Sequence, residues 1–195
     1  MYHTRLLNNR TFYETLTRFD ESLAAEVRAQ GCGCGGRLHR ADYPRKPRAG
    51  PADLGPAYDR RHSFCCDREG CRRRATPASL RFLGRRVYLG VVVVLVSIMA
   101  HGLTGTRLTR LRDELGGSLS VRTIQRWRTW WREAFPRSPF WRQARGWFAP
   151  PVNRACLPAA LLQRFRGSTL GIRVRLLLAF LAPLTGVGAS SLRAG

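Results

Sequence analysis

Acidic residues are scarce in this chain of 195 residues. Asp and Glu together number 12 against 34 Lys and Arg, so the formal net charge is +22. Self-repulsion of this size opposes compaction, and it favours a polyanionic partner such as nucleic acid, an anionic membrane surface or an acidic protein. An ordinary enzyme for small metabolites is disfavoured by this charge balance.

Lysine is nearly absent too. Lys46 is the single lysine, and every other basic residue is arginine. The arginine guanidinium suits bidentate contacts with phosphate and guanine, although a GC-rich coding sequence also favours arginine whatever the function. The sign of the charge is therefore more informative than the choice of arginine.

The chain also lacks a long apolar run. The longest, residues 91–96, extends at most to residues 87–100, well short of the ~20 residues that cross a bilayer. A second run at residues 176–184 contains Pro183, and residues 1–7 have no apolar signal core. We expect a cytoplasmic, nucleoid-associated protein without a membrane span, in which clustered cysteines bind metal rather than form disulfides.

The distribution of glycine, proline and apolar residues predicts a mainly α-helical protein with a small β zinc ribbon and a helix-turn-helix core. We expect an N-terminal helix within residues 1–31 and a zinc-ribbon-like module with a basic, proline-rich insert in residues 32–80. A helical core with the helix-turn-helix follows in residues 85–135. Residues 136–195 are expected to form a C-terminal helical segment and tail, with helices near residues 158–166 and 170–181.

The N-terminal helix is expected over residues 11–29. Thr11 and Glu14 have the spacing of a capping box, in which each side chain satisfies a free backbone N–H group at the helix start. Apolar residues follow at helical spacing and predict one buried stripe: Phe12, Leu16, Phe19, Leu23 and Val27.

Five of the six cysteines lie in residues 32–80, in two short-spaced groups. Zn²⁺ prefers four tetrahedral ligands, and thiolates are among its best. We expect Zn²⁺ to bind Cys32, Cys34, Cys66 and Cys71, with Cys65 as an alternative to Cys66. The C-x-C and C-x4-C spacings depart from the usual C-x2-C, so His39 or His62 can replace a sulfur, and free buried cysteines are the alternative to a metal site. Cys156 stands alone in an apolar setting and is expected in the core.

A helix-turn-helix is expected between residues 107 and 135. A short helix over residues 107–115, a Gly116-Gly117 turn and a second helix over residues 121–135, with Ser120 as its N-cap, have the right proportions. The second helix has an apolar face of Val121, Ile124, Trp127, Trp131 and Phe135. The opposite face carries residue types that read DNA bases: Arg122, Gln125, Arg126 and Thr129. On the first helix, phosphate contacts are expected from Arg107, Arg110 and Arg112. A plain helical hairpin is the alternative.

All five tryptophans fall within one segment, and they are expected to form a local core rather than to stack on single-stranded bases: Trp127, Trp130, Trp131, Trp141 and Trp147.

Three stretches resemble the N-terminal, DNA-binding part of bacterial insertion-element transposases and related small proteins. They are residues 32–36, the run FCCDREGCRRRATPASLRFLGRR (residues 64–86) and the run LSVRTIQRWRTWWREAF (residues 119–135), which is similar to S-x-R-T-I-x-R-W recognition helices. The resemblance implies a zinc ribbon followed by a helix-turn-helix that binds DNA. The C-x-C pair and the proline-rich insert depart from that pattern.

Strand-transfer chemistry is not expected. A transposase catalytic domain needs acidic residues that hold two metal ions, and this chain has no Asp or Glu after Glu133. No nucleophile pairs with a base either, so we expect no enzyme. The sequence predicts a protein that binds double-stranded DNA in a sequence-dependent manner, as a transposase-related accessory or regulator. An RNA- or ribosome-associated zinc protein, a membrane-surface protein and a decayed mobile-element remnant remain as alternatives.

Overall fold

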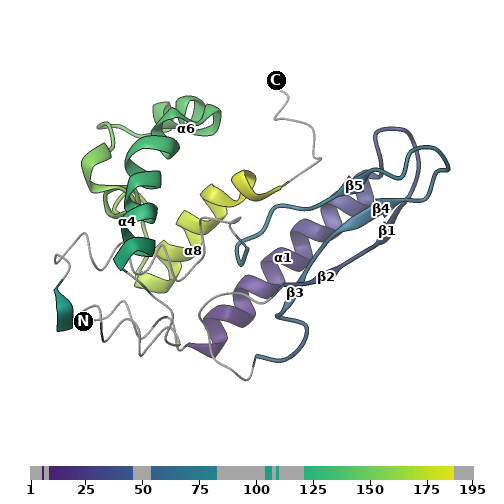
Figure 1. Cartoon of the computed structure of the whole chain (residues 1–195), viewed down its shortest axis with the longest axis horizontal. Helices are drawn as coiled ribbons and strands as arrows, with labels where there is room; N and C mark the ends of the chain where they lie inside the picture. The colour runs from purple at the N-terminus through teal and green to yellow at the C-terminus, as the bar shows by residue number, and fades with distance from the viewer. Residues whose placement is uncertain are drawn as a thin grey trace.

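The computed structural model describes residues 6, 9–45, 54–82, 104–106, 109 and 121–186. Within them the protein is mainly helical with a small antiparallel sheet, as expected. In Figure 1 the long helix α1 (Arg10–Gln30) runs beside the strands, and the later helices lie to the other side. The apolar run at residues 87–100 lies outside the described residues, and so does the expected helix at residues 107–115 except for Thr109, which is helical.

Helix α1 begins two residues earlier than a capping box at Thr11 requires. Asn9 is the N-cap, and its side chain accepts a hydrogen bond of 3.0 Å from the backbone N–H of Phe12. Glu14 instead accepts a hydrogen bond of 2.9 Å from Arg10, one helical turn away. The capping-box prediction is therefore wrong, because Asn9 already satisfies the first turn.

The buried face of α1 is rotated from the predicted stripe. Phe12 and Leu16 are buried as expected, but Phe19 is 37% exposed. Tyr13, Asp20 and Ala24 complete the buried face instead. Asp20 can lie there because polar groups from a distant segment satisfy its carboxylate.

That segment is Ser79–Arg81. The Asp20 carboxylate accepts hydrogen bonds from the backbone N–H of Leu80 at 2.6 Å and from Arg81 Nε at 2.8 Å. The Arg81 guanidinium also donates to the carbonyl of Tyr58 at 2.9 Å, and neither member of the ion pair is exposed. A buried charge pair of this kind joins α1 to two loop segments.

The strands form one long hairpin with an added third strand. β1 (Leu38–Arg40) pairs antiparallel with β4 (Phe64–Cys66), and β4 pairs with β5 (Arg74–Ala75). Further along the same hairpin, β2 (Tyr43–Pro44) pairs with β3 (Arg60–Arg61). The register sets Leu38 opposite Cys66, which brings the segments before β1 and after β4 together at one end.

The expected helix over residues 121–135 is not a single α-helix. It is α4 (Val121–Thr129), then a π-helical turn η2 (Trp130–Ala134), then α5 (Phe135–Arg137). In the π-turn the backbone N–H of Phe135 donates to the carbonyl of Trp130. The widened turn places three large rings against one another, with the Trp131 and Phe135 centroids 4.7 Å apart.

The C-terminal half consists of short helices. α8 (Leu170–Leu181) has the predicted bounds, whereas the helix expected near residues 158–166 is only α7 (Ala159–Leu162), with Gln163 as its C-cap. The remaining elements are α6 (Pro139–Ala144), η3 (Arg145–Trp147), η4 (Arg154–Cys156) and η5 (Ala182–Thr185).

Among the described residues, the buried apolar side chains form two separate cores. The large one is built by α1, α4, η2 and the C-terminal helices and contains three of the five tryptophans: Trp127, Trp131 and Trp141. The small one lies under the sheet around Ala24, Leu38, Phe64 and Cys66. Trp147, by contrast, is 71% exposed. Cys156 is exposed as well, so its assignment to the core is wrong, because the adjacent Leu157 takes the buried position.

Of the helices that the structure describes, none combines the length and the apolar character that a membrane span requires.

Candidate metal centre and candidate nucleic-acid interface

The first cysteine pair lies in a tight turn between α1 and β1. The Cys32 N–H donates to the Gly36 carbonyl at 2.9 Å, and the Gly35 N–H donates to the Cys32 carbonyl at 2.8 Å. Gly35 has a φ of +82°, which favours glycine. A Cβ atom on Gly36 would lie 2.6 Å from Cys66 Sγ, so this position also needs glycine. The turn presents Cys32 and Cys34 toward the hairpin.

The second pair flanks the turn between β4 and β5. The Cys66 N–H donates to the Arg73 carbonyl at 2.9 Å, and the Cys71 N–H donates to the Arg68 carbonyl at 3.1 Å. Gly70 has a φ of +79° within this turn. The two turns lie at the same end of the hairpin because the register pairs Leu38 with Cys66.

The four cysteine sulfurs converge. The side chains of Cys32, Cys34, Cys66 and Cys71 each offer a sulfur, and all four sulfurs lie within 4.8 Å of one another. Cys34 Sγ is 3.5 Å from Cys66 Sγ, and Cys32 Sγ is 3.7 Å from Cys71 Sγ. Tetrahedral thiolates at the usual Zn–S length of about 2.3 Å have sulfurs about 3.8 Å apart. These residues form a group that can hold a metal ion, and its spacing fits a four-thiolate site.

The structure decides between the alternative ligands that the sequence left open. Cys65 alternates with Cys66 along β4, and its sulfur contacts the backbone carbonyls of Cys66 and Arg72 at 3.7 Å rather than the other sulfurs. His39 lies 3.3 Å from an Asp67 carboxylate oxygen. His62 lies 3.3 Å from an Asp42 oxygen. Neither histidine belongs to the cluster.

The pKa values of two thiols in the cluster are shifted in opposite directions. Hydrogen bonds from the Gly36 N–H and from the neighbouring thiols lower the pKa of Cys34 to about 6. Burial raises the pKa of the Cys66 thiol to about 12. The Arg68 guanidinium donates to the Cys34 carbonyl at the edge of the cluster. A cation is therefore the natural means of keeping Cys66 as thiolate beside Cys34.

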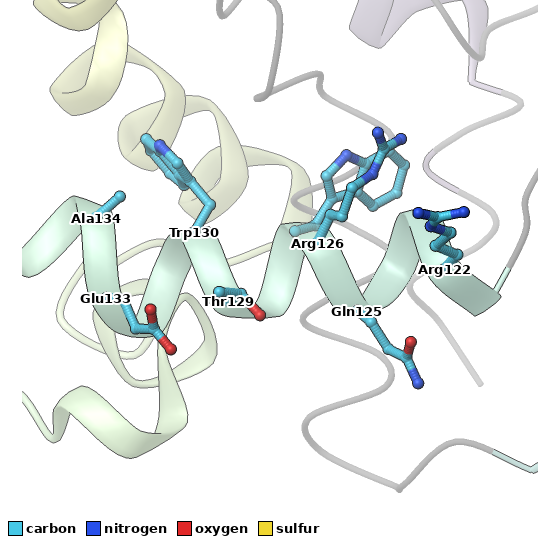
Figure 2. A pocket seen from close by; sticks show the side chains of 8 residues that line it. Arg122, Gln125, Arg126, Thr129, Trp130, Glu133 and Ala134 are labelled. Carbon is cyan, nitrogen blue, oxygen red and sulfur yellow. The ribbon is translucent and has the colours of Figure 1, made fainter.

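The exposed face of α4 forms a second candidate site. Ile124 and Trp127 are buried against the large core, whereas the four predicted base-contacting residues are exposed: Arg122, Gln125, Arg126 and Thr129. They line a hollow of about 580 Å³, together with Trp130 and Glu133 of η2. In Figure 2, Arg122, Arg126 and Trp130 follow one another along the helix, and Gln125 and Glu133 point to its other side.

The sequence did not single out Trp130 and Glu133 for this hollow. A signal was present, because Trp130 is four residues after Arg126 and Glu133 is four residues after Thr129, so each continues a helical stripe. Val121, which was expected on the buried face, is 39% exposed. It occupies the first position of α4, beyond the edge of the large core.

The other three residues expected to contact DNA, Arg107, Arg110 and Arg112, lie outside the described residues, so the structure brings together four of the seven.

Compared with protein-family models, with curated proteins and with solved structures, the chain has no match. The resemblance to insertion-element transposases stays a prediction, and the function has to be inferred from the two sites themselves.

Proposed function

We propose that this protein binds double-stranded DNA in a sequence-dependent manner, with the exposed face of α4 in the major groove. The observation that carries the proposal is that α4 has one buried face and one exposed face. Ile124 and Trp127 anchor the helix in the large core, and its arginines, glutamine and threonine are left free for a ligand. Arginine pairs with guanine, glutamine with adenine, and threonine contacts a thymine methyl group or phosphate.

The proposed interface extends to the helix-turn-helix partner of α4. In this arrangement Arg107, Arg110 and Arg112 contact phosphates on either side of the groove and contribute affinity without sequence information. The net charge of +22 supports the same partner, because each phosphate contact releases condensed counterions from DNA. A DNA partner implies the cytoplasmic, nucleoid-associated location that the sequence predicts.

We assign Zn²⁺ to the four-cysteine centre as a structural ion. Cys32, Cys34, Cys66 and Cys71 would hold it, and no ligand position would remain for a substrate. Bound zinc supplies cross-linking between the two turns and no reaction step. The proposed role is that of a transposase-related accessory or regulator without strand-transfer chemistry, not an enzyme.

The test is selection of preferred duplexes from a random pool, followed by binding assays on variants. Arg126→Ala is expected to cost about 1–3 kcal/mol on the selected duplex and to relax the preference at one base position. Arg110→Ala is expected to weaken binding to all duplexes alike and to reduce the salt slope by about 1.

Arg132→Ala is the matched control, because Arg132 is exposed on η2 but does not line the hollow. It is expected to leave the base preference unchanged. Equal losses on every sequence for the Arg126 and Arg110 variants, or no selected duplex at all, would contradict the assigned roles.

A second candidate function is binding of structured or single-stranded RNA. The observation that favours it is Trp147, which is 71% exposed and packs one edge against Phe180 with ring centroids 6.2 Å apart. An exposed indole beside Arg145 suits base stacking. Competition between the selected DNA duplex and structured RNA, for the wild type and Trp147→Ala, separates the two functions.

A further inference from the structure

We propose that the metal-centre end of the protein is a second, sequence-independent surface for DNA phosphates, so that one molecule holds two duplex segments. This inference rests on the proposed DNA binding by α4 and adds a second duplex to it. The surface consists of five exposed side chains around the two cysteine turns, here called the knuckle arginines: Arg37, Arg68, Arg72, Arg73 and Arg74.

The positive charge of this surface is not neutralised by ion pairs. Within the described part of the chain, no salt bridge joins a knuckle arginine to a carboxylate. Within the turn, Asp67 is engaged by His39 and by the backbone N–H of Arg37, and Glu69 is the other acidic residue. A net positive, solvent-exposed cluster suits a phosphate backbone.

The backbone behind these side chains is held in place. The Arg73 carbonyl accepts from the Cys66 N–H at 2.9 Å, and the Arg37 carbonyl accepts from the Asp67 N–H at 3.0 Å. The Arg68 carbonyl accepts from the Cys71 N–H. The metal ligands and the knuckle arginines therefore share one hydrogen-bonded framework, which limits the conformational entropy lost on binding.

The position of the surface argues for a second duplex rather than for a longer contact with the first. Figure 1 shows α4 at one end of the molecule and the turns beyond β1, β4 and β5 at the other end, with the length of α1 running toward them. The exposed face of α4 and the knuckle arginines thus belong to elements at opposite ends of the molecule, and we assign a separate duplex to each. Phosphate contacts there carry no base information, so the second duplex can have any sequence.

The experiment uses the zinc-loaded full chain. The selected duplex is immobilised, the protein is added, and retention of a fluorescent second duplex of unrelated sequence is measured. The triple variant R72Q/R73Q/R74Q is expected to bind the selected duplex as the wild type does but to retain the second duplex at least tenfold less. The salt slope of that retention should fall by about 2.7, for three lost phosphate contacts.

Two further variants complete the design. R142Q/R154Q/R166Q removes the same charge from exposed residues on neither surface and should retain the second duplex. R72K/R73K/R74K keeps the charge and should retain it too. Zinc content of one ion per chain in each variant verifies that the turns are intact.

The outcomes separate this inference from the proposed function. If the wild type binds no duplex, the proposed function fails and this inference fails with it. If it binds the selected duplex but the second is not retained, or is retained equally by R72Q/R73Q/R74Q, only this inference is overturned. Equal retention by R72Q/R73Q/R74Q is also the result expected if two self-associated copies bridge the duplexes, each through its α4. Binding of RNA alone at the knuckle surface overturns it as well.

Discussion

At the scale of single residues, neighbouring cysteines have different roles. Cys65 and Cys66 are adjacent in β4, and side chains alternate between the two faces of a strand. Cys66 is buried and faces the other sulfurs, whereas the Cys65 sulfur contacts backbone carbonyls. Two adjacent residues of the same type are thus a candidate metal ligand, Cys66, and a thiol outside the cluster, Cys65.

The two cysteines form a matched pair for a test. Cys66→Ser is expected to abolish zinc binding at equimolar metal, because one thiolate of four is lost and the oxygen ligand is poorer. Cys65→Ser should retain one zinc per chain. Metal analysis after gel filtration measures both, and an equal loss of zinc in the two variants would contradict the ligand assignment.

The acidities of the thiols predict the pH dependence of metal binding. Near pH 7 the Cys34 thiol, with its pKa of about 6, is largely ionised, whereas the Cys66 thiol, with its pKa of about 12, still carries its proton. Metal binding must displace that proton, so the zinc affinity of the metal-free chain should rise as the pH increases from 7 to 9. Below pH 6 the Cys34 thiolate is lost as well, and the affinity should fall more steeply. Competition with a chromogenic chelator across this range measures both effects, and a flat profile would refute them.

At the scale of elements, one buried carboxylate ties α1 to the rest of the molecule. Asp20 accepts from Leu80 and Arg81, and Arg81 in turn donates to the carbonyl of Tyr58. Both charges are removed from water, so each depends on the other. This contact explains why a polar residue lies on the buried face of an otherwise apolar helix stripe.

Removal of the Asp20 charge should therefore be costly. Asp20→Asn leaves the Arg81 guanidinium buried without its counter-charge and is expected to lower the free energy of unfolding by about 3–5 kcal/mol. The neighbouring Glu21 is exposed, and Glu21→Gln should change it by less than about 0.5 kcal/mol. Denaturant unfolding compares the two variants, and similar midpoints would show that the buried pair is not needed.

The π-helical turn η2 makes another contact between elements through its aromatic rings. Trp131 is fully buried, and its ring lies 5.0 Å from Trp130 and 4.7 Å from Phe135, measured between centroids. The π-helical geometry of η2 brings these rings onto one side of the chain. Trp131 and Phe135 therefore attach the segment after α4 to the large core.

At the scale of the whole molecule, the described part of the chain has two cores with different supports. The large core contains three of the tryptophans and most buried aliphatic residues, whereas the small core is built from four buried residues beside the cysteine turns. A core of that size does not stabilise a hairpin by itself. We expect the metal to stabilise the sheet end and the apolar helices to stabilise the other.

Removal of the metal by a chelator should destabilise the sheet end without destabilising the C-terminal helices. At zinc concentrations about 100 times the dissociation constant, the ion contributes about 2.7 kcal/mol, near a 100-fold change in hydrogen-exchange protection. Removing it with EDTA is expected to reduce protection by that factor in β1, β4 and β5 and to leave α6 and α8 protected. Added zinc should restore the strands. A parallel loss of protection in α8 would show that the two parts unfold together.

The sequence by itself determined the features that depend on local composition and periodicity. The bounds of α8 and the polar face of α4 follow from neighbouring residues. The sequence also narrowed the candidate metal ligands to the two cysteine groups, with Cys65 and Cys66 as alternatives. Spacing along a helix or within a short turn determines which side chains share a face, and no distant partner is needed for that conclusion.

Only the tertiary structure decided the choices that depend on partners far along the chain. The pairing of Leu38 with Cys66 selects Cys66 over Cys65 for the cluster of four sulfurs. Arg81, distant in sequence, allows Asp20 to be buried, and Leu157 leaves Cys156 in solvent. A strand that shifts by one residue exchanges its two faces, and a buried charge is tolerated only with its counter-charge. Neither condition can be evaluated until the chain has folded back on itself.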